Sequence, residues 1–169
     1  MTRGNPVTSM AKPWSPSSIL LALGGAIVGS IGVYFILLRP SLLAEDIRYM
    51  GPSAAEVAET GPRLGAWLTQ VFRVLGGYAL ATGLLTLALA ATAFRERRPV
   101  AVAGAFIGGA ASIGLMTVVN FAIGSDFKWL LLGCASVWAL SFVAFWAEGA
   151  VARSASHRPD SANHKGSKI

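Results

Sequence analysis

Five polar side chains lie beside or inside long apolar segments, where an unpaired charge or amide is costly. They are Arg73, Asn120, Tyr34, Glu45 and Asp46. A charge in an apolar segment usually faces the protein interior and has a partner. We expect Glu45 or Asp46 to be the partner of Arg73, with Glu56 and Glu59 as weaker candidates. The predicted cluster could be an ion or ligand site; the alternatives are an arginine that reaches the lipid headgroups or a structural ion pair.

Two of the apolar segments also end in single polar groups. Asn120 is expected to make one hydrogen bond to a neighbouring helix. Glu148, at the end of the last segment, could pair with Arg95, Arg97 or Arg98. The alternative for Glu148 is a solvated carboxylate at the membrane surface.

The positions of histidine and cysteine exclude several chemistries. Both histidines, His157 and His164, are in the C-terminal tail, and Cys134 is the single cysteine. A histidine-ligated haem in the membrane, a Ser–His or Cys–His catalytic pair and disulfide exchange within the chain are therefore excluded. The first apolar segment also has no carboxylate, the usual carrier in proton-coupled transport. We expect no enzyme, no cofactor and no metal site.

Composition assigns the chain to a membrane. Of its 169 residues, 54% are hydrophobic and 13% are charged, whereas soluble domains carry about 25% charged residues. Crossing about 30 Å of hydrocarbon takes about 20 apolar residues. The sequence predicts an all-α integral membrane protein, a four-helix bundle occupying residues 17–150. The expected spans are 17–38, 67–94, 99–124 and 128–148, with an N-terminal segment 1–16 and a disordered tail 152–169.

Glycines at four-residue spacing occur in two of these spans. Gly25 and Gly29 form one such pair, and Gly104 and Gly108 form another. Small residues at this spacing let two helix backbones approach closely. We favour packing within the chain, with homodimerisation as the alternative.

The loop over residues 39–66 reads as a folded cap. Leu43, Ile47 and Met50 have near-helical spacing, which predicts a short interfacial helix that Gly51 ends. Ser53 and Glu56 match a capping box, which predicts a second short helix over about residues 54–60.

The basic residues predict the orientation. With four spans, nine basic residues lie on the side of the termini and four on the other side. This bias places both termini in the cytoplasm and the 39–66 loop outside. The net charge of +6 is dispersed around the membrane ends, which favours contact with anionic lipid headgroups and argues against nucleic-acid binding.

Residues 39–51, with the sequence RPSLLAEDIRYMG, and the four-span layout resemble small four-helix bacterial inner-membrane proteins that have no assigned activity. The resemblance implies a bacterial inner-membrane location and no catalytic role.

Three functions remain open. The first is a non-enzymatic structural, accessory or assembly partner, which contacts lipid and either a second copy or another membrane protein. The second is a small oligomeric transporter or channel that uses the polar cluster near the outer face. The third, an enzyme acting on lipid, would need Glu45, Asp46 and Arg73 around an open cleft.

Overall fold

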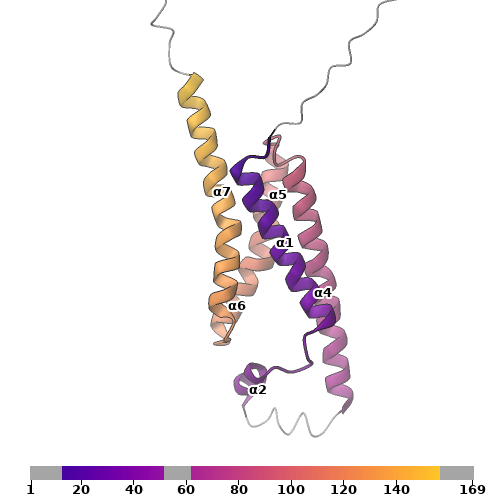
Figure 1. Ribbon diagram of the computed structural model, residues 1–169. Helices are drawn as coiled ribbons and strands as arrows, with labels where there is room; N and C mark the ends of the chain where they lie inside the picture. Colours follow the sequence, from indigo (N-terminus) through magenta and orange to yellow (C-terminus); the bar gives the residue numbers. More distant parts are fainter. Residues whose placement is uncertain (1–12, 52–61, 157–169) are drawn as a thin grey trace, which may run out of the picture.

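The computed structural model describes residues 13–51 and 62–156, and these form an all-α bundle with no strand (Figure 1). Four helices are long and apolar enough to cross a membrane. They are α1 (Pro16–Leu37), α4 (Pro62–Ala91), a third span made of α5 (Pro99–Gly109), η1 (Ala110–Gly114) and α6 (Leu115–Ala122), and α7 (Lys128–Ser156). The expected fold class is confirmed.

The ends of the helices follow their sequence signals. Ser15 caps α1, because its hydroxyl accepts a hydrogen bond from the backbone N–H of Ser18, and Pro16 takes the first position. Pro99 opens α5 in the same way. The expected interfacial helix is present as α2 (Ala44–Met50), and Gly51 ends it with a φ of 75°. The second expected short helix lies outside the described residues.

The last helix is longer than the sequence predicts. α7 continues to Ser156, so residues 152–156, which we assigned to the tail, are helical. A helix that is already formed adds each further residue at little cost, and Ala150 and Ala152 are good helix formers. Polar composition alone therefore predicts that the tail begins at residue 152, before the helix ends at Ser156.

α1 packs most extensively against α4, and glycines on both helices form the contact. A Cβ added to Gly76 would lie 2.7 Å from the carbonyl oxygen of Gly32. One added to Gly83 would lie 2.6 Å from the carbonyl oxygen of Gly25 and against the backbone of Gly29. The two backbones thus meet directly, which is how helices gain van der Waals contact in lipid. No atom of a described residue lies within 4 Å of a Cβ added to Gly104 or Gly108.

The buried core lies toward the end of the bundle where α1 begins. It consists of five buried residues from four helical segments and the turn after α4: Leu21, Ala90, Phe94, Ala105 and Phe142. Phe94 meets Phe142 edge-on with ring centroids 6.0 Å apart, and Trp138 meets Phe142 at 5.3 Å. Trp138 also donates its indole N–H to the carbonyl of Ala105 at 3.2 Å. These side chains fill the centre of this half of the bundle.

An ion pair closes the same end. Glu148 lies 2.7 Å from Arg97, which confirms one of the three partners expected for it. The Glu148 carboxylate also accepts hydrogen bonds from the backbone N–H and the hydroxyl of Ser17, both at 2.9 Å. These contacts join the start of α1, the turn after α4 and the end of α7. We call this the terminal end, and the opposite end, where α2 lies (Figure 1), the α2 end.

The close contact between α1 and α4 makes a prediction about two adjacent glycines. Gly76→Ala should destabilise the protein by about 1–3 kcal/mol, because the added methyl group would push the two backbones apart. Gly77→Ala is the matched control, since nothing lies within 4 Å of its added Cβ. The measurement is thermal unfolding in mild detergent, followed by the near-ultraviolet circular dichroism of the tryptophans. Equal midpoints for the two variants would contradict the contact.

Candidate functional site

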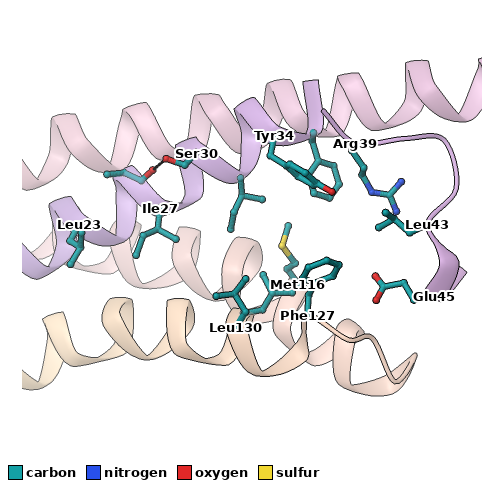
Figure 2. A pocket seen from close by; sticks show the side chains of 14 residues that line it. Leu23, Ile27, Ser30, Tyr34, Arg39, Leu43, Glu45, Met116, Phe127 and Leu130 are labelled. Carbon is teal, nitrogen blue, oxygen red and sulfur yellow. Dashed lines mark hydrogen bonds between the residues drawn. The ribbon is translucent and has the colours of Figure 1, made fainter. Parts of the chain in front are cut away.

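A long cavity of about 590 Å³ lies between α1, α6 and the start of α7 (Figure 2). On α1, its wall is a face with four-residue spacing, formed by Leu23, Ile27 and Ile31. Met116 and Leu130 face them from α6 and α7. From Leu23 to the end of α1 the cavity follows about 21 Å of helix axis. Its volume is within the range of ordinary ligand sites, about 300–1,000 Å³.

Charged groups line this cavity at its α2 end. Arg39 and Glu45 both lie there, at the opposite end from Leu23 (Figure 2). The side chain of Arg39 is only 8% exposed, and its guanidinium lies 3.4 Å from the centre of the Phe72 ring. Nη2 of Arg39 lies 3.0 Å from the carboxylate oxygen Oδ2 of Asp46. A buried guanidinium is stable only when it is paired and hydrogen-bonded, so Asp46 and Phe72 hold Arg39 in place. We call this end of the cavity, lined by Arg39 and Glu45, its mouth.

Asp46 and Glu45 fasten α2 to two other parts of the chain. Besides pairing with Arg39, Asp46 accepts a hydrogen bond from the backbone N–H of Leu43 at 2.8 Å, which caps α2. Glu45 accepts hydrogen bonds from the Ser125 hydroxyl and the Asp126 backbone N–H, both at 2.9 Å. Ser125 and Asp126 lie in the turn between α6 and α7. We call this set of contacts the α2 clasp, which spans the cavity mouth.

A second ion pair lies on the outside of the clasp. Arg48 lies 2.9 Å from Asp126, with both side chains largely exposed. The hydrogen bond that Arg48 donates to the Asp126 carboxylate raises the pKa of Arg48 above its ordinary value. Solvent screens exposed pairs of this kind, which therefore contribute little to stability, so the hydrogen bonds of Glu45 hold α2 more firmly than the Arg48 pair does.

The structure brings together three of the five residues expected to cluster. Glu45, Asp46 and Tyr34 lie around the cavity mouth: Tyr34 and Glu45 line it, and Asp46 binds Arg39. Arg73 is exposed and makes no ion pair or hydrogen bond with any described residue. Asn120 donates to the carbonyl of Met116 within its own helix at 2.8 Å. It lines a separate cavity of about 490 Å³ between α1, α4 and the third span.

Sequence reasoning missed Arg39 and Ser125. In the sequence, Arg39 is a single charge that follows the first span and precedes a proline, so it indicates only the orientation of that span. Its spacing of seven residues from Asp46 carries no recognised signal, and the aromatic ring under it belongs to another helix. Ser125 is a single hydroxyl in a short turn. Only the folded chain shows that both meet α2.

This arrangement offers polar groups for binding at one end of an apolar cavity. Arg39 and Glu45 are not paired with each other, and the oxygen Oε1 of Glu45 accepts no hydrogen bond from a described residue. Apolar side chains line the rest of the cavity, apart from Ser30, whose hydroxyl bonds to its own helix. Within residues 13–51 and 62–156, no group of three or more histidine, cysteine or acidic residues could hold a metal ion. The cavity can accept an apolar body that has a polar end.

Comparison with protein-family models, curated proteins and solved structures found no match to this chain.

The α2 clasp makes a prediction about Glu45. Glu45→Ala should speed the hydrogen exchange of the α2 amides roughly tenfold or more, because each bond to a charged group contributes about 1.5–3 kcal/mol. The exchange rate of Glu45→Gln should lie between those of the wild type and of Glu45→Ala, since the glutamine amide oxygen can still accept both bonds. Hydrogen-exchange mass spectrometry in detergent micelles measures the effect. The clasp is refuted if Arg48→Gln, which removes only the exposed pair, speeds exchange as much as Glu45→Ala.

Proposed function

We propose that this multi-pass membrane protein is a non-enzymatic accessory or assembly partner in the bacterial inner membrane. One observation carries the proposal: the cavity between α1, α6 and α7 is apolar along its length and has charges only at its mouth. A route for a polar solute would need polar groups near the middle of the bilayer.

The partner that fits this cavity is a transmembrane helix of another protein. The open face of α1 extends for about 21 Å along the helix axis, so it can receive a row of side chains from a helix lying alongside. Leu23 is 48% exposed on this face. The partner's adjoining loop would meet Arg39, Glu45 and Tyr34 at the mouth, where polar contacts can select it.

The proposed orientation follows from the distribution of charge. Arg95, Arg97, Arg98 and Arg153 lie at the terminal end of the bundle. Basic residues favour the cytoplasmic side, so both termini would face the cytoplasm. The α2 clasp and the cavity mouth would then face outward.

Transport remains the second candidate function, and the charged mouth of the cavity favours it. A 590 Å³ cavity with Arg39 and Glu45 at one end could admit a small amphiphile. The filled core around Leu21, Phe94 and Phe142 stands across the other half of the bundle. Transport would require that core to open, whereas binding a partner would not.

Filling the cavity provides the test. Ile27→Trp should block the open face of α1, because Ile27 lies in the middle of the wall. Leu140→Trp is the matched control, since Leu140 is 52% exposed and does not line the cavity. Affinity purification of the tagged protein from native membranes in mild detergent should recover one protein in stoichiometric amount. That partner should be lost with Ile27→Trp and kept with Leu140→Trp.

Two results would contradict the proposal. One is recovery of the wild-type chain with no stoichiometric partner other than itself. The other is a partner retained by Ile27→Trp, which would place the contact elsewhere. If the chain is recovered alone and its proteoliposomes move an amphiphilic solute in a way that depends on Glu45, transport becomes the preferred function.

A further inference from the structure

Another cavity, of about 550 Å³, opens at the terminal end and is lined by more charged groups than the others described above. Three arginines line it, Arg95, Arg97 and Arg153, together with a single carboxylate, Glu148. Three guanidinium groups and one carboxylate thus face the same cavity. Ser15 and Ser17 contribute hydroxyl groups, and Phe94 and Phe145 contribute aromatic rings.

The one carboxylate is already engaged. Glu148 pairs with Arg97 and accepts two hydrogen bonds from Ser17. Arg153 makes no ion pair with any residue in the described part of the chain. An anion entering the cavity would therefore meet the positive charge of Arg153, which no carboxylate among the described residues neutralises.

Gly149 brings two of the guanidinium groups together. A Cβ added to Gly149 would lie 3.2 Å from Nη1 of Arg97 and 4.0 Å from Nη1 of Arg153. Both guanidinium groups therefore lie beside Gly149, and an anion between them would reduce the repulsion of their like charges. Paired guanidinium groups match the geometry of a phosphate group, which each can bind through two parallel N–H bonds.

An apolar cavity adjoins the basic one. Its volume is about 430 Å³, and it lies between α5 and α7, lined by Val102, Phe106 and Trp146 among others. The two cavities share Arg97 and Phe145. An amphiphile could thus place a charged head among the arginines and a hydrocarbon chain along α5, which a soluble anion could not do.

We propose that the cavity around Arg95, Arg97 and Arg153 binds the phosphate headgroup of an anionic phospholipid, whose chain occupies the cavity between α5 and α7. Basic pockets between membrane helices are suited to such headgroups. Binding the lipid at this site would brace the end of α7 against the turn after α4. This inference is independent of the proposed partner at the other end.

The experiment uses the full chain, purified in mild detergent and titrated with phosphatidylglycerol or with phosphatidylcholine of the same acyl chains. Native mass spectrometry counts the bound lipids. Phosphatidylglycerol should bind at lower concentration than phosphatidylcholine. Arg153→Gln should weaken its binding about fivefold, as expected for one arginine near a membrane surface. Arg63→Gln, an equal loss of charge at the first turn of α4, should leave binding unchanged.

Two further measurements distinguish a bound lipid from a bound soluble phosphate. Ala103→Phe, which narrows the apolar cavity, should weaken phosphatidylglycerol binding, and millimolar inorganic phosphate should not displace the lipid. Displacement by inorganic phosphate would overturn the lipid assignment in favour of a soluble anion. Equal binding of the two lipids, or equal weakening by Arg153→Gln and Arg63→Gln, would overturn the site itself.

Discussion

The direct backbone contact between α1 and α4 determines how the rest of the bundle is arranged. Lipid chains are as apolar as leucine, so helices in a membrane gain stability from close packing instead of from hiding apolar surface. Gly32 and Gly83 allow that approach. The contact occupies one face of α1 and leaves Leu23 and Ile27 on another face, toward α6 and α7. Because α6 does not close over those residues, a cavity remains on that side of α1.

The two ends of the bundle are consequently built differently. At the terminal end, an aromatic core and the bonds of Glu148 to Arg97 and Ser17 tie three helices together. At the α2 end, the helices are joined mainly through α2, whose Glu45 contacts the turn between α6 and α7. A few hydrogen bonds can open at modest cost, whereas an interlocked core cannot. This difference is the reason that we propose the α2 end as the one that receives a partner.

Much of the fold could be predicted from the sequence, because length and apolar character suffice to recognise a membrane span. The interfacial helix was also predictable, since Leu43, Ile47 and Gly51 carry its spacing and its stop. The residues of the candidate site were harder to predict from the sequence, because helical spacing does not tell which of two neighbouring residues faces another helix. The contact at Gly76 turns Phe72, one helical turn earlier, toward α1 and Arg39. Arg73, the next residue, is left exposed.

The central claim is that the open face of α1 is a protein-binding surface, and the most direct test is to ask what lies against it in native membranes. Benzoylphenylalanine at Leu23 would photo-cross-link whatever occupies the cavity. The same probe at Leu140 is the control, because Leu23 is 48% exposed and Leu140 is 52% exposed. We predict one protein adduct of defined mass from Leu23 and none from Leu140. Adducts to lipid alone at both positions would contradict the account.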